Sequence, residues 1–506
     1  MEIILTASAL LLWGFLWWAD LNDARSIGNT VTVRNQWIHL GYTTLILIGS
    51  LLLVFKGFPL FFGDGFPGLG RGPFLKIASV VIAFLISFFW YLYISWLDIY
   101  EKEKIGYVML VFGISSGCTF LVFPLSDLVG MTGLELNGGF VNDLIYTTVR
   151  IGMVEEIVKF LPFLLILLTT RQVDESFDYI LYGCVSALGF AFVENILYLS
   201  NYNLFPINGR SLYSSVAHMF DTSVICYFLA IAHYRKTPRI VAFFKGYILA
   251  SLAHGFYDFW LMTEGFNWPL MTYLFFFATI HLFTMMKNNL INISEKFDEA
   301  IRLDPVKMRN RLFNLMLLIM MGGWMAVVIV NGQRLAIPFL SNSFLTYLYV
   351  LVFITVSFGS INIVKGYLAP IVLSFRFWLP LVNRHPNYLG IQLELLEPVT
   401  RNPLFRDLPE DLSKQIRLAR RVVVDDDFNW YEIRDPQLPP GEESRWIIRP
   451  VQFEFDLRDG KVHRLHIARL SPDVDLGRVV FEPNDLVFRQ MGLSRVVSGD
   501  SLSLQG

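Results

Sequence analysis

Ionisable and amide side chains recur inside long apolar stretches of this sequence. An ionisable group in hydrocarbon costs a few kcal/mol or more, so it requires a partner or a function. Such groups fall in four consecutive apolar stretches, within residues 152–170, 178–200, 211–233 and 240–263. They include Glu155, Glu156, Lys159, Glu194, Asn195, His218, Asp221, His254 and Asp258.

Helical spacing sorts the groups of the first two stretches. Glu155 and Lys159 are four residues apart, so they share a face and can pair. Glu156 is rotated from Glu155 by about 100° and needs another partner. Phe190 and Glu194 also share a face, which predicts an aromatic wall beside this carboxylate.

The two histidines have carboxylates at helical spacing. Asp258 follows His254 by four residues and can orient the imidazole and fix its tautomer. Asp221 follows His218 by three residues, and we expect the same role for it.

These side chains are suited to activating a water molecule. A carboxylate whose pKa is raised by burial and lowered again by Lys or His can act as a general base. Histidines can donate to the oxyanion of a tetrahedral intermediate or protonate a leaving amine. The sequence shows no obvious serine or cysteine nucleophile, so it predicts peptide hydrolysis by an activated water.

We expect no cofactor, although zinc stays open because Glu and His are metal ligands. No HExxH motif is present, and the spacing of the groups does not require a metal. The three cysteines, Cys118, Cys184 and Cys226, fall in apolar runs and form no CxxC pair, so disulfides and thiolate metal sites are not expected.

The distribution of charge divides the chain. Of its 506 residues 54% are hydrophobic and only 17% are charged, which excludes a soluble globular enzyme, a disordered chain and a disulfide scaffold. Residues 1–375 hold 23 basic and 23 acidic side chains, and residues 376–506 hold 18 and 20. We therefore predict a membrane domain, 1–375, and a soluble domain, 376–506. The near-zero net charge of each part argues against nucleic acid as a partner.

The membrane domain is predicted to be an all-α bundle of about eleven spans in the lipid bilayer. One set of alternate loops holds 14 basic residues and the other set holds 6. Because cytoplasmic loops carry an excess of Lys and Arg, the first set is expected inside the cell. This predicts an outside N-terminus and a cytoplasmic C-terminus. The expected spans are 3–19, 36–55, 76–97, 105–125, 152–170, 178–200, 211–233, 240–263, 268–288, 311–331 and 344–374.

The C-terminal domain is predicted to be mixed α/β. A helix is expected over 407–422, and strands over 431–433, 445–448, 451–457 and 478–481. Asp459-Gly460 is a hairpin signal. Without a phosphate loop or a metal-spaced cluster, the domain is interpreted as a cytoplasmic regulatory or docking module with a possible protein partner.

The motifs, in this order and spacing, resemble those of the PrsW-type intramembrane proteases. They are Glu-Glu-x-x-Lys at 155–159, Phe-x-x-x-Glu-Asn at 190–195, an isolated His218 and His-x-x-x-Asp at 254–258. The resemblance covers a core of about residues 75–290 and leaves out the spans 311–331 and 344–374. That family is similar to the CAAX-processing and bacteriocin-processing membrane proteases, although CAAX proteases carry a His where this chain has Glu194.

The resemblance implies a glutamic-type endopeptidase of the bacterial cytoplasmic membrane. It would cut membrane-anchored protein substrates within or next to a membrane helix, in regulated proteolysis and signalling. Carried over by motif, the catalytic residues would be Glu155, Glu156, His218 and His254, with Glu155 as the base. The supporting residues would be Lys159, Phe190, Glu194, Asn195, Asp221 and Asp258.

Two other functions use the same residues. In a non-catalytic scaffold or receptor with a cytoplasmic interaction domain, the charged groups would only hold helices together, in a dry and fully paired site. An ion-coupled transporter would be expected to show internal repeats or broken helices around a midplane site, and no clear repeat is present.

Overall fold

The computed structural model describes residues 2–361, apart from 27–29, 64, 71, 264, 267, 299–300 and 302. It also describes residues 368 and 371 and, beyond them, only the strand residues of the C-terminal part. The chain divides into two units, Met1–Arg384 and His385–Gly506.

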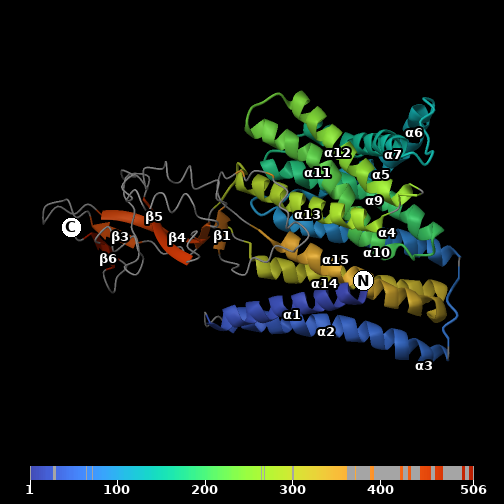
Figure 1. The fold of residues 1–506 in the computed structure, drawn as a ribbon, viewed down its shortest axis with the longest axis horizontal. Coiled ribbons are helices and arrows are strands. Elements are labelled where there is room, and N and C mark those ends of the chain that lie inside the picture. The colour runs from blue at the N-terminus through green and yellow to red at the C-terminus, as the bar shows by residue number, and fades with distance from the viewer. Residues whose placement is uncertain are drawn as a thin grey trace. The chain divides into compact units, whose positions relative to one another are not determined.

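The described part of the first unit is helical, as predicted (Figure 1). Its α-helices are α1 (Glu2–Ser26), α2 (Thr30–Leu52), α3 (Phe58–Phe62), α4 (Pro73–Leu97), α5 (Ile105–Cys118), α6 (Val122–Gly130), α7 (Phe140–Tyr146), α8 (Val154–Thr169), α9 (Ser176–Asn201), α10 (Ile207–Gly209), α11 (Ser215–Tyr234), α12 (Arg239–Met262), α13 (Pro269–Asn292), α14 (Pro305–Asn331) and α15 (Gln333–Gly359). A 3₁₀ turn, η2, covers Thr119–Leu121, and π-helical turns cover Leu53–Gly57 (η1), Thr147–Met153 (η3) and Arg210–Ser214 (η4).

The predicted count of eleven spans is not supported. In the described part of the chain, eight helices are long and apolar enough to cross a membrane, or nine if Gln333–Phe344 and Tyr347–Gly359, which meet at a 47° bend, form one span. Neither α1 nor α8 is among them. For α8 the physical reason is clear, because it carries three charges within one and a half turns. The eight are Val33–Phe62, Pro73–Leu97, Ile105–Gly130, Ser176–Asn201, Ile207–Tyr234, Arg239–Met262, Leu270–Asn292 and Pro305–Asn331.

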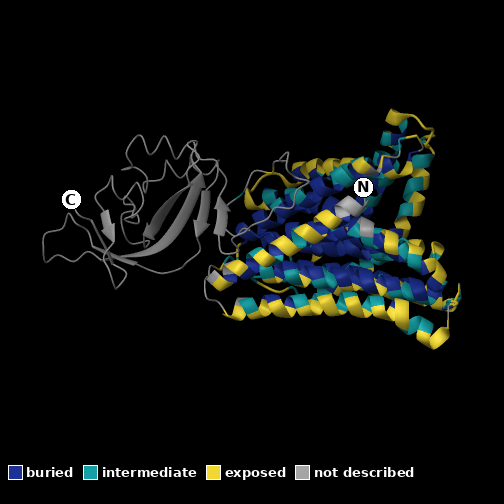
Figure 2. Cartoon of the chain, turned by 60° about the horizontal axis from the view of Figure 1, so that its bottom comes forward, coloured by how far each residue is buried: buried dark blue, intermediate teal, exposed yellow. Residues whose placement is uncertain are grey.

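The four helices with the chemically active residues pack as one group. α11 contacts α9 on one side and α12 on the other, and α8 contacts all three. α9, α11 and α12 lie side by side in Figure 1. Figure 2 shows that buried residues are concentrated in the interior of the helical unit. Both α8 and α11 continue directly from a π-helical turn, η3 and η4. Such turns are rare and occur frequently at functional sites.

Two glycines let η3 touch α12 backbone to backbone. A Cβ atom on Gly152 would lie 2.5 Å from the carbonyl oxygen of Ser251, and one on Gly255 would lie 2.4 Å from Thr148 Cα. Small residues allow this close approach between membrane helices. The contact sets the position of the first turn of α8 relative to His254, which directly precedes Gly255.

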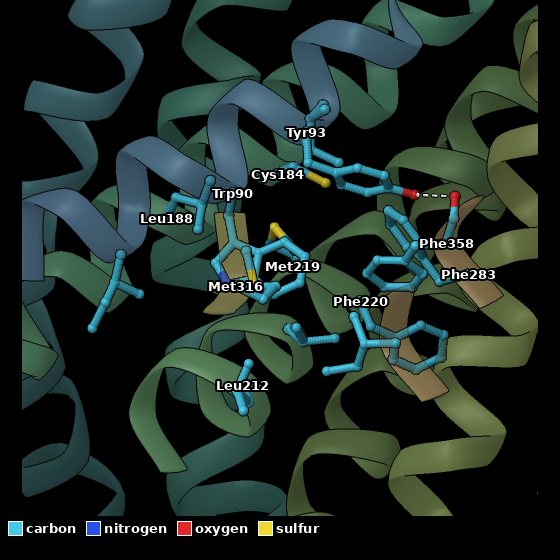
Figure 3. Close-up of a cluster of buried hydrophobic side chains, with 14 of the residues drawn as sticks. Trp90, Tyr93, Cys184, Leu188, Leu212, Met219, Phe220, Phe283, Met316 and Phe358 are labelled. Carbon is cyan, nitrogen blue, oxygen red and sulfur yellow. Dashed lines mark hydrogen bonds between the residues drawn. The ribbon is translucent and has the colours of Figure 1, made fainter. Parts of the chain in front are cut away.

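A buried aromatic cluster connects α4 to the rest of the bundle (Figure 3). The Tyr93 hydroxyl donates to the Phe358 carbonyl at 3.1 Å, and the two rings stack with centroids 5.1 Å apart. Trp90 Nε1 donates to the Ser211 carbonyl at 2.8 Å. One helix therefore holds both the end of α15 and the π-helical turn that leads into α11.

The described residues of the second unit are strands of one sheet. Its order is β1-β2-β4-β3-β7-β6, and β5 pairs with β4. The predicted strands 431–433, 445–448 and most of 451–457 lie within β3 and β4, whereas the predicted strand 478–481 and all but the last residue of the predicted helix 407–422 lie outside the described residues. The strands are β1 (Tyr388–Ile391), β2 (Val422–Asp425), β3 (Tyr431–Arg434), β4 (Arg445–Asp456), β5 (Val462–Leu470), β6 (Leu493–Arg495) and β7 (Ser501–Leu504).

The contact between η3 and α12 leads to a stability prediction. Gly255→Ala should lower the free energy of unfolding by about 1–3 kcal/mol, because the new methyl group overlaps the backbone of Thr148. The measurement is thermal unfolding of the purified protein in detergent. Gly113→Ala, in the interior of α5 with open space around it, is the matched control and should be as stable as wild type or slightly more so. Equal melting of the Gly255→Ala variant and wild type would contradict the close contact.

Candidate active site

The Lys159 ammonium lies at the centre of the candidate site. Its Nζ is 2.8 Å from Glu156 Oε1 and 3.1 Å from Glu155 Oε2. The same atom lies 2.8 Å from His218 Nδ1 and 3.4 Å from His254 Nδ1. Lys159 is fully buried. One cation thus brings together the four predicted catalytic residues, which come from α8, α11 and α12.

The two glutamates have different surroundings. Glu156 is fully buried, and both its oxygens are bound: Oε2 accepts from Thr222 Oγ1 at 2.9 Å, and Oε1 lies 2.8 Å from His254 Nδ1. The Glu155 side chain is 15% exposed, and its Oε2 lies 3.5 Å from His254 Nε2. A small molecule can therefore reach Glu155, whereas Glu156 is enclosed by protein.

His218 is oriented by Glu194 and not by Asp221. Its Nε2 lies 2.7 Å from Glu194 Oε2, and its Nδ1 faces the Lys159 ammonium. An ammonium can only donate, so these neighbours place the lone pair on Nδ1 and the proton on Nε2. The expected pairing of His218 with Asp221 is wrong, because Asp221 Oδ2 approaches His254 Nδ1 instead, at 3.7 Å.

His254 lies between carboxylates. Its Nε2 is 3.3 Å from Asp258 Oδ2, which confirms the predicted pair four residues apart on α12. On the other edge of the ring, Nδ1 faces Glu156 and Asp221. Carboxylates therefore lie near both nitrogens, and they fix the plane of the imidazole.

Phe190 provides the predicted aromatic wall. Its ring centroid is 4.5 Å from Lys159 Nζ and 5.6 Å from the centre of the His218 ring. A cation over an aromatic face is attracted by the quadrupole of the ring. One turn earlier on α9, Ser186 Oγ donates to the Lys159 carbonyl at 2.5 Å. α9 therefore contacts both the backbone and the ammonium of this lysine.

Arg210 is a residue of the site that the sequence did not reveal. Arg210 lies directly before the expected span 211–233 and is therefore expected in a loop. Its side chain, however, is only 11% exposed. Its Nη2 lies 2.6 Å from Glu194 Oε2, and its Nε donates to Asn195 Oδ1 at 2.6 Å. A signal was present, because polar residues recur every fourth position on one face of η4 and α11. They are Arg210, Ser214, His218 and Thr222.

The site has one partly exposed side. The side chains of Glu155, Glu194 and Asp258 are 15%, 21% and 20% exposed, while Glu156 and Lys159 are fully buried. The partly exposed groups come from α8, α9 and α12. The site is therefore partly open on this side, whereas Glu156 and Lys159 are enclosed by protein.

Residue types in the site suit zinc, but their arrangement does not. Ligand atoms of Glu155, His218 and His254 lie within 4.8 Å of one another, and so do those of Glu156, Asp221 and His254. Both groups hold ligands that zinc uses. The Lys159 ammonium, however, contacts both glutamates and both histidines. In this arrangement the ammonium lies among the ligand atoms of both groups.

Comparisons with known proteins cover the same helices. Residues 103–284 match the family model described as PrsW family intramembrane metalloprotease. Protease PrsW of Shouchella clausii is 31% identical over 192 residues, which are 37% of this chain and 86% of that protein. Protease PrsW of Bacillus subtilis is 28% identical over 208 residues, 40% of this chain and 92% of the relative. Protease PrsW of Clostridioides difficile is 29% identical over 198 residues, which are 38% of this chain and 80% of that protein.

No solved structure matches the chain. The part that matches the family model, 103–284, holds all the residues gathered around Lys159 and ends before α14 begins. This chain covers most of a relative with which it shares 31% identity, and the predicted catalytic residues converge in the matched part. The protein belongs to the PrsW family of intramembrane proteases.

Proposed function

We propose that this intramembrane protease hydrolyses peptide bonds of membrane-anchored proteins with a water molecule that Glu155 activates. One observation carries the assignment. Of the two glutamates on the Lys159 ammonium, Glu155 is the partly exposed one, and Glu156 is fully buried with both oxygens bound. Only Glu155 can meet both a water molecule and a substrate without unfolding of the site.

The geometry suggests a role for each group. Glu155 takes a proton from water as the oxygen attacks the peptide carbonyl carbon. His254, with Nε2 3.5 Å from Glu155, can donate to the oxyanion that forms. His218, whose Nε2 proton faces Glu194, holds that carboxylate in place. When the C–N bond breaks, the leaving nitrogen takes the proton that water gave up. Lys159 positions Glu155 and stays in place through the reaction.

A metal is not part of this proposal. The family description names a metalloprotease, but the ammonium of Lys159 lies among the atoms that would bind the ion. We therefore assign water activation to the carboxylate alone, in a glutamic-type reaction.

The position in the membrane follows from loop charges. We propose that the loops with 14 basic residues face the cytoplasm, which places the N-terminus outside the cell. The eight spans, the bent pair in α15, the 25-residue helix α1 and the continuous helix formed by α7, η3 and α8 would together make eleven. The C-terminal residues 376–506 would then be a cytoplasmic α/β module that docks a protein partner or regulates cleavage in signalling.

Replacement of Glu155 gives the first test. Glu155→Gln should reduce cleavage by about 10²-fold or more, because an amide cannot accept the proton from water. Its melting temperature should change little, since the side chain is partly exposed. Cleavage is measured on a co-expressed panel of single-span membrane proteins, with folding followed by gel filtration in detergent.

Glu156→Gln provides the matched comparison. This variant should lose activity together with stability, because it removes the buried carboxylate charge that pairs with the Lys159 ammonium. A folded Glu155→Gln variant that cuts like wild type would rule out Glu155 as the base.

Removal of metal with a chelator distinguishes water activation by the Glu155 carboxylate from water activation by a metal ion. Purified enzyme treated with a zinc chelator and passed through a desalting column should keep its cleavage rate, because Glu155 works without a metal. The readout is cleavage of a substrate from the panel before and after treatment, with zinc added back as a third arm. Loss of activity on chelation and recovery with zinc would replace the carboxylate mechanism with a metal-dependent one.

Arg210 should act through Glu194. Arg210→Gln should lower kcat by about 10²-fold with little change in KM, because Glu194 then loses the guanidinium that fixes it against His218. Arg210→Lys should not restore the rate, since a lysine cannot bind Glu194 and Asn195 together. A change in KM alone would instead show that Arg210 contacts the substrate.

A further inference from the structure

Three buried carboxyl groups meet where α4 ends and α9 begins. Asp98 follows the last residue of α4, Glu175 is the N-cap residue of α9, and Asp178 lies in the first turn of α9. All three residues are buried, with exposed fractions of 1%, 2% and 0%. Ligand oxygens of the three lie within 4.8 Å of one another. This acidic cluster belongs to neither the active site nor its supporting residues.

Each carboxyl group is anchored through one oxygen only. Asp98 Oδ2 accepts from the Glu103 backbone N–H at 3.2 Å, and Glu175 Oε2 accepts from Ser294 Oγ at 2.7 Å. Asp178 Oδ2 accepts from the Glu175 backbone N–H at 2.8 Å. The second oxygens, Asp98 Oδ1, Glu175 Oε1 and Asp178 Oδ1, are buried and find no donor among the described residues. Three acceptors are thus held in place with nothing bound to them.

Nearby lysines bind elsewhere. Lys102 donates to backbone carbonyl groups, among them that of Asp98. Lys296 pairs with Glu101 and Asp174. Within the part of the chain that the structure describes, no Lys, Arg or His side chain forms an ion pair with the three clustered carboxyl groups. Lys102 and Lys296 therefore offset the negative charge of the cluster only in part, without a direct ion pair to it.

Such a cluster is costly without a cation. Burial raises the pKa of Asp98 to about 6 and that of Glu175 to about 7. The buried hydroxyl of Tyr100, which also finds no partner among the described residues, has its pKa raised by burial and by the charge of Glu175. Ca²⁺ and Mg²⁺ prefer carboxylate oxygens and would remove this electrostatic cost.

We propose that Asp98, Glu175 and Asp178 bind a divalent cation of the oxygen-preferring class, Ca²⁺ or Mg²⁺. The ion would join the end of α4 to the start of α9. That junction matters for the enzyme, because α9 also carries Phe190 and Glu194 at the active site. The site would thus be structural, and it is separate from the water-activating groups.

The test uses the full-length protein in detergent, stripped with EDTA and then desalted. Tryptophan fluorescence follows thermal unfolding without added ion, with CaCl₂ and with MgCl₂. We expect one of the two ions, or both, to raise the melting temperature of wild type by several degrees, because an ion that binds only the folded state stabilises it. The ion that acts identifies which of the two the site takes.

Glu175→Gln removes one ligand charge. This variant should melt no lower than stripped wild type, since the repulsion in the cluster falls, and it should gain nothing from either ion. Glu135→Gln, at an exposed loop carboxylate, and Glu155→Gln, in the active site, should both keep the wild-type response. The Glu155→Gln arm separates this site from any ion at the active site.

Two outcomes would overturn the proposal. If neither ion shifts the melting of stripped wild type, the clustered carboxyl groups hold protons and not a cation. If Glu175→Gln responds to the ion as wild type does, the ion binds somewhere else on the protein.

Discussion

A single buried ammonium organises the enzyme. Lys159 has no exposure, and a charged group placed there is tolerable only with carboxylates in contact. Glu155 and Glu156 are supplied by its own helix, within one turn. The remaining contacts come from His218, His254 and Phe190 on three other helices. The packing of α8 against α9, α11 and α12 therefore follows from the need to surround this one charge.

The two adjacent glutamates that pair with Lys159 differ in exposure. Successive residues on a helix point about 100° apart, so Glu155 and Glu156 cannot both face the interior. Glu156 is directed toward Thr222 and His254 and is enclosed, while Glu155 remains partly open. The buried carboxylate of Glu156 balances the charge of Lys159. The partly exposed carboxylate of Glu155 also pairs with this lysine and remains accessible to water. A Glu-Glu-x-x-Lys sequence thus supplies a buried ion pair and a second, partly exposed carboxylate.

The charged face of α8 cannot lie against lipid, so the neighbouring helices must shield it. In the apolar windows of α9 and α11, 78% and 89% of the residues are buried inside the protein, compared with 33% for α12. α11 is thus the most enclosed of these three helices. The glycines at 152 and 255 let η3 pack closely against α12. Burial of α8 by its neighbours also explains why hydropathy alone is a poor guide to the number of spans here.

The sequence by itself determined the helical membrane class and the pairs within one helix, Glu155 with Lys159 and His254 with Asp258. These depend only on composition and on the 3.6-residue period. Tertiary structure decided that Glu194 orients His218, that Asp221 turns to His254, and that Arg210 is buried at the site. It also placed the Lys159 ammonium in contact with both glutamates and both histidines. Helical periodicity says which residues share a face, but the rotation of one helix against another comes from side-chain packing between distant segments, which no local pattern encodes.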